Sequence, residues 1–148
     1  DNDELLVGVV NRQDIIQALQ QTQKQPQFGE TVDNLTLSGF KLGDSIDANC
    51  ITIMGNITQF MINESNIASA GAMSMIISNA ATIAVRKLHR MQTAVDEMHV
   101  ICINSIEQGE EISVTLQIDK KLCKVEVVVR TVEQLKYKAH LILKIMKK

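Results

Sequence analysis

The sequence predicts an α+β domain in which an antiparallel sheet curls around one long apolar helix. Residues 70–90 carry apolar side chains at nearly every helical phase, a pattern typical of a helix that is buried on most sides. Beyond this segment the period changes, and apolar residues alternate with polar ones through three runs, as in strands with one face on a core. A curled sheet is the arrangement that buries a helix of this kind.

The helix is expected to begin directly after Ser69, whose hydroxyl can accept a hydrogen bond from a free N–H group of the first turn. The first half of the helical segment has no charged residue. Its cations, Arg86, Lys87 and Arg90, stand at its end. Positive charge at that end complements the negative pole of the helix dipole. Both ends of the segment therefore carry the residues that a helix of this polarity favours.

The strands are predicted from β-branched content and from alternation. Residues 34–48 are weakly patterned and are expected to form an entry strand or loop, and residues 63–70 a polar loop. An Asp119-Lys120-Lys121 turn joins two of the later strands. Because consecutive strands follow one another through short turns, they should form an antiparallel meander. The expected strands are residues 50–62, 98–103, 112–118, 123–129 and 135–145.

The N-terminal residues have a different character. Residues 5–10 form a short apolar run, and Ile15, Ile16 and Leu19 give the following segment one helical apolar stripe. The next stretch (QQTQKQPQFGE) is rich in Gln, contains the only Pro and has almost no apolar content, so we expect a linker there. The chain begins at Asp1 within a pattern, which suggests a piece of a longer protein.

Composition argues against nucleic-acid or membrane partners. The formal net charge is -2, and only three Phe and one Tyr are available for stacking on bases. No charged segment precedes an apolar one as in a signal peptide, and no apolar span is long enough to cross a bilayer. Cys50, Cys102 and Cys123 each lie in an apolar run and are expected to be buried free thiols, and no CxxC or HxxxH spacing predicts a metal site. These features favour a cytoplasmic protein.

Two segments resemble known families. NITQFMINESNIASAGAMSMIISNAATIAVRKL, residues 56–88, resembles the strand–loop–helix core of hotdog-fold acyl-CoA thioesterases, and the later strands follow in a similar order. LVGVVNRQDIIQAL, residues 6–19, resembles the closing strand and helix of a CBS (cystathionine-β-synthase) domain. The order is similar to that of bacterial proteins that join a DRTGG domain, a CBS pair and a hotdog domain. The resemblance implies the end of a CBS domain at 1–22, a linker at 23–33 and a hotdog domain at 34–148.

The CBS resemblance implies two ligand contacts in a complete domain. The residues at the positions of Asn11 and Asp14 commonly contact an adenosyl ligand, and a carboxylate can accept hydrogen bonds from both ribose hydroxyls. The alternative is local, with Asn11 as a helix N-cap and Asp14 as the acid that supports the cap. Binding of an adenine nucleotide is therefore expected of the parent CBS region and not of this fragment.

The hotdog resemblance implies a thioester site at the start of the helix. In this family a backbone N–H at that point polarises the thioester carbonyl, and Gly71 and Ala72 occupy the matching positions. A carboxylate on the same helix activates water or attacks. Its matching position falls at Ser78 or Asn79, and no Asp or Glu occurs between Asn66 and Val95. Asn cannot act as a general base, and Ser would need a base of its own.

Other polar residues near the helix offer partial substitutes. Glu64 is a loop acid that could reach the helix start, or it is simply solvated. Asn63 and Asn66 could orient a water or an acyl carbonyl, or they could cap the turn. Ser78 and Asn79 could orient a ligand or form hydrogen bonds at a subunit interface.

The remaining titratable residues are expected to have ordinary roles. Asp96 and Glu97 should lie at the exposed start of a strand. His89 falls in the charged end of the helix, His99 in a strand and His140 on the polar face of the last strand. We expect surface or interface positions for all three histidines.

Two functions follow from these observations. The first is a non-catalytic or weakly active hotdog module of a CBS-regulated protein, which binds an acyl-CoA-like ligand, mediates dimerisation, or does both. The second is an acyl-CoA thioesterase that uses the helix N–H as its oxyanion site. The missing carboxylate favours the first. The resemblance also implies a homo-oligomer, a dimer or a tetramer, and no cofactor beyond a CoA thioester.

Overall fold

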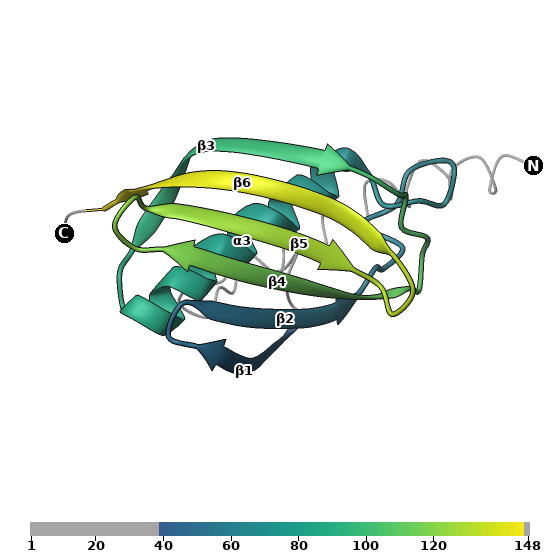
Figure 1. The fold of residues 1–148 in the computed structure, drawn as a ribbon. Coiled ribbons are helices and arrows are strands. Elements are labelled where there is room, and N and C mark those ends of the chain that lie inside the picture. The colour runs from purple at the N-terminus through teal and green to yellow at the C-terminus, as the bar shows by residue number, and fades with distance from the viewer. Residues whose placement is uncertain (1–38, 147–148) are drawn as a thin grey trace, which may run out of the picture. The chain divides into compact units, whose positions relative to one another are not determined.

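The computed structural model describes residues 39–146 (Figure 1). These residues belong to one compact unit, Thr36–Lys148. The segments predicted as the end of a CBS domain (1–22) and as a linker (23–33) lie outside the described residues. Asn11 and Asp14 therefore remain predictions as ligand contacts.

The described residues form six strands and one helix. The helix is interposed between the second and third strands, as the change of sequence period predicted. The elements in chain order are β1 (Lys41–Asp47), β2 (Cys50–Asn56), α3 (Ala70–His89), β3 (Thr93–Cys102), β4 (Glu111–Asp119), β5 (Lys124–Arg130) and β6 (Leu135–Ile145).

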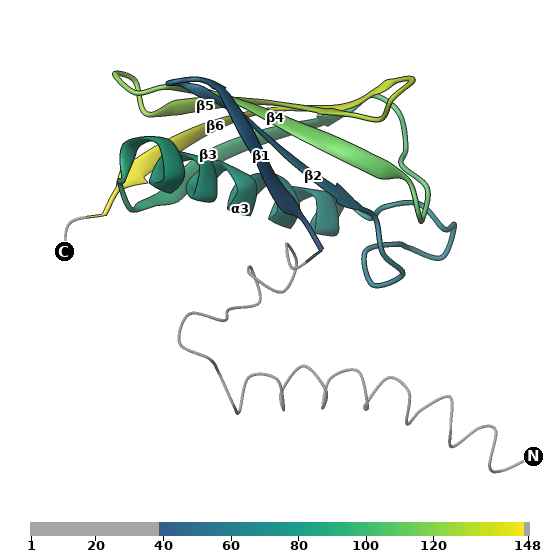
Figure 2. The ribbon, with the colours of Figure 1, turned by 90° about the horizontal axis from the view of Figure 1, so that it is seen from below.

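All six strands belong to one antiparallel sheet with the order β1-β2-β4-β5-β6-β3. The strands before and after the helix are therefore separated by the whole β4–β5–β6 meander. To join them, α3 runs along one face of the sheet, as Figure 2 shows. This arrangement confirms the predicted α+β class, with an antiparallel sheet and one central helix.

The ends of α3 follow from its sequence. Ser69 is the N-cap, with extended backbone angles, and its Oγ accepts a hydrogen bond from the N–H of Ala72 at 3.0 Å. Arg90 ends the helix in the left-handed region at φ 55°, and its N–H donates to the carbonyl of Arg86 at 2.9 Å. The basic last turn lies at the negative end of the dipole.

The core lies between α3 and the inner face of the sheet. Every second residue of β4 and β5, and of β6 from Tyr137 to Leu143, is buried, which confirms the predicted alternation there, whereas Leu135 is half-buried and Ile145 is exposed. The helix contributes one buried face, whereas its opposite side is only half covered. The single-chain sheet thus buries less of α3 than the sequence predicted. The buried helix residues are Met73, Ile76, Ile77, Asn79, Ala80, Ala81, Ala84 and Val85.

The predicted strand 50–62 was too long. β2 ends at Asn56, and the chain then forms a loop whose apolar residues Ile57 and Met61 are 1% and 8% exposed. Both side chains anchor the loop to the core. Ile57 also forms backbone hydrogen bonds with Gly109 and Glu110. An apolar run by itself cannot separate a strand from a loop that is packed in this way.

β3 begins earlier than predicted, at Thr93 and not at Met98. The register shifts between Val95 and Glu97, so a bulge interrupts the alternation just where Asp96 and Glu97 stand. The exposed position of this acidic pair is as expected, but it lies within the strand.

The three cysteines are free thiols, but only Cys50 is buried. Cys102 is exposed, and Cys123 is half-buried in the β4–β5 turn at φ 51°, so β5 begins at Lys124. The prediction of three buried thiols was therefore wrong. Apolar neighbours in sequence do not ensure burial at a strand end or in a turn.

The single tyrosine of the chain should make stability fall at high pH. Tyr137 is 4% exposed, and burial together with a hydrogen bond to Cys102 raises its pKa to about 12. An unfolded chain ionises its tyrosine near a pKa of about 10. Because ionisation then favours the unfolded state, the free energy of unfolding should fall as pH rises from about 10 through 12.

This decrease can be measured by urea unfolding at successive pH values. The comparison is with Tyr137→Phe, which should lack the part of the decrease that belongs to this residue. Absorbance at 295 nm reports ionisation of Tyr137 alone, because the chain has one Tyr and no Trp. Half-ionisation near pH 10 in a protein that is still folded would contradict the assignment.

Candidate functional site

The first turn of α3 presents two exposed backbone N–H groups for which no described residue is an acceptor, those of Ala70 and Gly71, and only Gly71 is at a position implied by the resemblance. Gly71 is exposed, and no described residue accepts a hydrogen bond from its N–H. A Cβ atom placed on Gly71 would have no neighbour within 4 Å. An open N–H at the positive end of a 20-residue helix is suited to an anion or a carbonyl oxygen that gains negative charge.

Ala72 differs from Gly71 in this respect. Its N–H already donates to the Oγ of Ser69 at 3.0 Å. The two positions that the resemblance implied for the polarising N–H are thus not equivalent in the structure. Gly71 is the better candidate, and Ser69 and Ala72 hold the turn that presents it.

The loop before the helix is organised by Asn63. Its Oδ1 accepts hydrogen bonds from the N–H of Ser65 at 2.9 Å and of Ile67 at 3.4 Å. These contacts cap the turn, which is one of the two roles that the sequence suggested for Asn63. Glu64 is exposed in the same turn, and Asn66 adopts a φ of 62°.

The half-covered side of α3 forms what we call the open stripe, consisting of Gly71, Met75, Ser78 and Thr82. Apart from the exposed Gly71, these residues are intermediate in burial. Asn79 lies beside the stripe, is 7% exposed and is engaged in an interaction of its own. The stripe contains no carboxylate, so the helix supplies donors and small polar groups but no general base.

A second loop, residues 103–110, lies against the segment that leads into α3. Ile67 pairs with Glu107 in an isolated antiparallel bridge, and the N–H of Ala68 donates to the carbonyl of Ile106 at 2.7 Å. Sequence analysis did not single out this loop, because Ile106 is the one large apolar residue of 104–110 and nothing in the sequence shows that it is buried. The two loops enclose a polar hollow of about 510 Å³ lined by Ser65, Asn66, Glu107, Gln108 and Gly109.

The basic residues of α3 lie at its other end. Arg86 and Arg90 border a hollow of about 410 Å³ together with Met91 and Met146. A helix of 20 residues is about 30 Å long. Within one chain, these cations are therefore well separated from the N–H of Gly71.

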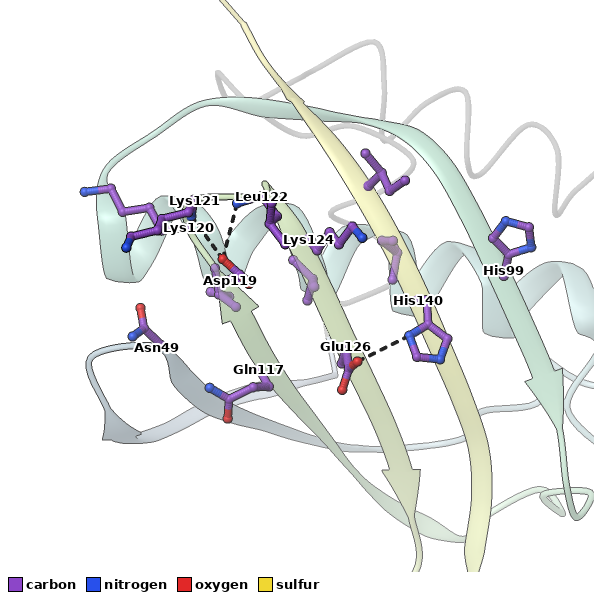
Figure 3. Close-up of a pocket in the computed structure, with 14 residues that line it drawn as sticks. Asn49, His99, Gln117, Asp119, Lys120, Lys121, Leu122, Lys124, Glu126 and His140 are labelled. Atoms are coloured by element: carbon purple, nitrogen blue, oxygen red, sulfur yellow. Dashed lines mark hydrogen bonds and ion pairs between the residues drawn. The ribbon is translucent and has the colours of Figure 1, made fainter.

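A larger hollow of about 910 Å³ lies on the outer face of the sheet (Figure 3). The strand registers place Gln117, Glu126, His140 and His99 in one row across β4, β5, β6 and β3. Glu126 and His140 point toward each other, with Oε1 and Nδ1 3.6 Å apart. Because α3 covers the opposite face, this hollow is separated by the sheet from the open stripe.

Each histidine lies on the element predicted for it, with His89 at the end of α3, His99 in β3 and His140 in β6. His99 and His140 are exposed as expected, whereas His89 is half-buried and its Nε2 is buried. Among residues 39–146, no three His, Cys, Asp or Glu side chains are grouped so as to hold a metal ion. None of the described helices is long and apolar enough to span a bilayer.

Comparison with curated proteins finds a longer relative of this chain. No family model matches the chain. The uncharacterized protein YtoI of Bacillus subtilis is 28% identical over 151 residues, an alignment that covers 100% of this chain and 34% of the relative. The chain thus spans about a third of the length of this longer protein.

Solved structures share the fold. A hypothetical thioesterase from Streptococcus pneumoniae with coenzyme A has a TM-score of 0.70 at 9% identity, covering 78% of this chain and 93% of that one. Zebrafish thioesterase superfamily member 2 has a TM-score of 0.69 at 14% identity, covering 80% of this chain and 89% of that one. The protein smu.793 from Streptococcus mutans bound to acetyl CoA has a TM-score of 0.68 at 12% identity, covering 84% of this chain and 98% of that one. The structural likeness confirms the predicted hotdog fold.

The N-cap hydrogen bond of Ser69 should contribute measurably to the stability of the protein. Ser69→Ala removes the acceptor of the Ala72 N–H, so we expect a loss of about 1 kcal/mol in the free energy of unfolding. Ser74→Ala is the matched control, because alanine at an interior helix position is neutral or slightly stabilising. Urea unfolding of both variants measures the difference, and equal stabilities for the two would contradict the capping role.

Proposed function

We propose that this hotdog domain binds an acyl-CoA thioester at the start of α3 and acts as a non-catalytic or weakly active binding and dimerisation module. The observation that carries the proposal is the exposed Gly71, whose N–H has no acceptor among the described residues. Two of the structures that share the fold contain coenzyme A or acetyl-CoA, which supports this choice of ligand.

The geometry of the helix start suits a thioester carbonyl. The N–H of Gly71 would donate to the carbonyl oxygen, and the helix dipole would stabilise the negative charge on it. Because Gly71 has no side chain and no crowding neighbour, the thioester could approach the backbone closely. Met75 in the open stripe offers a flexible apolar contact for the acyl chain.

Turnover would need a group that α3 does not have. Hydrolysis of a thioester requires a base that activates water, and the helix carries Ser78 and Asn79 where the resemblance implies a carboxylate. Glu64 is exposed in a loop whose contacts are those of a capped turn. Polarisation of the carbonyl without a base supports binding and slow hydrolysis at most.

The second candidate remains an acyl-CoA thioesterase. The observation in its favour is the hollow beside the helix start, which brings Asn66 together with Glu107. Glu107 is exposed, and its hydrogen bonds with Glu110 are made by its backbone N–H and carbonyl and not by its carboxylate. Such a group could activate water, so the two candidate functions are separated by measuring release of free CoA.

We further propose that two copies pair through the free edge of β3. β3 bonds only to β6 among the described strands, and Ile101 and Ile103 are 54% and 44% exposed. The other edge, β1, has two register shifts within 7 residues, against one within the 10 residues of β3, and such irregularities disfavour edge-to-edge pairing. In the cytoplasmic parent protein, a nucleotide-binding CBS region would then regulate the paired hotdog domains.

The acyl-CoA site is tested by removing the N–H of Gly71. Gly71→Pro deletes this donor within the first helical turn, where a proline is best tolerated, and should weaken acyl-CoA binding about tenfold. Affinity is measured by isothermal titration calorimetry with acetyl-, octanoyl- and palmitoyl-CoA, with thiol release recorded in parallel. Ala70→Pro is the matched control, because it removes the neighbouring N–H of the same turn and keeps the N–H of Gly71.

Binding without thiol release supports the module, and release that decreases in Gly71→Pro and in Glu107→Gln makes the protein a thioesterase. Equal affinity in the two proline variants would remove Gly71 from the site. If the wild-type protein neither binds nor hydrolyses any of the three thioesters, the proposed function is wrong.

The dimer is tested at the β3 edge. Ile101→Glu places a charge on the exposed edge strand and should raise the dimer dissociation constant by about tenfold or more. The control is Leu122→Glu, since Leu122 is 59% exposed in the β4–β5 turn. Sedimentation velocity measures both variants, and a dimer that survives Ile101→Glu unchanged would exclude pairing through β3.

A further inference from the structure

We propose that Lys136 is a positioning residue, whose buried ammonium group holds the loop 103–110 and through it the start of α3. The proposal rests on the proposed function, because its consequence for binding requires that the thioester contacts Gly71. Its structural part, the connection from Lys136 to the helix start, can be tested without any ligand.

Lys136 is the only charged residue with a buried side chain among the described residues, at 6% exposure. Its place in β6 is on the outward side of the alternation, because its neighbour Tyr137 begins the inward series. Lys138, the next outward residue, is exposed. Lys136 is therefore covered not by the core but by the chain that follows β3, whose Ile103 and Asn104 donate backbone hydrogen bonds to the Lys136 carbonyl at 2.8 and 3.0 Å.

The ammonium group of Lys136 is well supplied with acceptors. Its Nζ donates to the carbonyl of Ser105 at 2.9 Å and to the Oε1 of Gln134 at 3.0 Å. The Oε2 of Glu110 lies 3.8 Å away. Two of the three N–H donors of the ammonium group are thus used in hydrogen bonds, and the Glu110 carboxylate is close enough for an ion pair but not for a third hydrogen bond.

Glu110 extends this contact to the far end of the loop. While its Oε2 faces Lys136, its Oε1 accepts the backbone N–H of Glu107 at 2.8 Å. The cation therefore holds the loop at two points, directly at Ser105 and through one carboxylate at Glu107. Ile106 stands between these points and is fully buried, so the loop has both a polar and an apolar anchor.

The loop in turn carries the segment that enters α3. The carbonyl of Ile106 accepts the N–H of Ala68, and the N–H of Gln108 donates to the carbonyl of Asn66 at 3.2 Å. Ala68 immediately precedes the N-cap Ser69. Lys136 thus holds Ser105 and Glu107, and Ile106 between them bonds to the residue before the N-cap. Displacement of the loop would therefore displace the turn that presents Gly71.

Loss of the Lys136 ammonium group should loosen the loop 103–110 locally and leave the sheet folded. Removing one partner of a buried ion pair leaves the other partner uncompensated. Here Glu110 is 31% exposed and can be hydrated, so the loss should open the loop and not unfold the sheet. Local opening of this kind is detected by amide hydrogen exchange.

The test compares Lys136→Met with Lys138→Met, which removes an exposed lysine two residues away on the same strand. Amide exchange is followed by NMR in the protein without ligand. We expect exchange of the Ala68 and Gln108 amides to become about tenfold faster in Lys136→Met, with Val127 in the central strand β5 unchanged. An unchanged Ala68 would overturn the proposal. Equal acceleration at Val127 would also overturn it, because it would show a general loss of stability.

Glu110→Gln provides a second variant in case Lys136→Met does not fold. It removes the charge but keeps an oxygen for the Glu107 N–H, so the same two amides should accelerate less than in Lys136→Met. Acyl-CoA affinity is measured on all variants, with about a tenfold loss expected in Lys136→Met and none in Lys138→Met. If the wild type binds no thioester, the proposed function fails and the exchange data alone decide the role of Lys136. Binding that is unaffected by a loosened Ala68 would show that the loop does not position the site.

Discussion

The packing of α3 against the inner face of the sheet is the constraint on which the other features depend. Ala80, Ala81 and Ala84 are fully buried, and their small side chains let the helix lie close to the strands. Ile76 and Ile77 fill the remaining space between helix and sheet. Since β2 and β3 stand far apart in the sheet, this single helix must also cross the width of the meander. The same contact therefore determines the topology, the core and the position of the helix start.

Local hydrogen bonds hold the loops around the start of α3. Asn63 caps one turn, Ser69 caps the helix, and the loop 103–110 supports both through Ala68. The turn that presents the Gly71 N–H is thus held by hydrogen bonds at Ala68 and Ser69, and a preorganised polarising group requires a donor that is fixed in this way. What separates a binding module from an enzyme on such a scaffold is a single base, since function is decided by the site and not by the fold.

The parts of the fold that were predicted correctly have strong local signals. The helix begins after Ser69 and ends at a basic turn, and the last strand covers Leu135–Ile145 as expected. Errors arose where tertiary contacts override the local pattern. The bulge before Glu97 concealed half of β3, and Ile57 continued an apolar run beyond the end of β2 because it anchors a loop. At the candidate site, Gly71 and Ala72 were indistinguishable in sequence, and only the N-cap contact of Ser69 separated them.

The sequence by itself determined the fold class, the helix and the lack of a carboxylate on it, because each of these depends on residues that are neighbours along the chain. The tertiary structure alone decided that Lys136 is buried and that Glu107 and Ile106 meet the segment before α3. It also decided that Phe40 lies over Gly55, where a Cβ atom would come within 2.4 Å of the ring. Such contacts join residues that are distant in sequence, so no local period records them, and they form only when separate strands and loops come together.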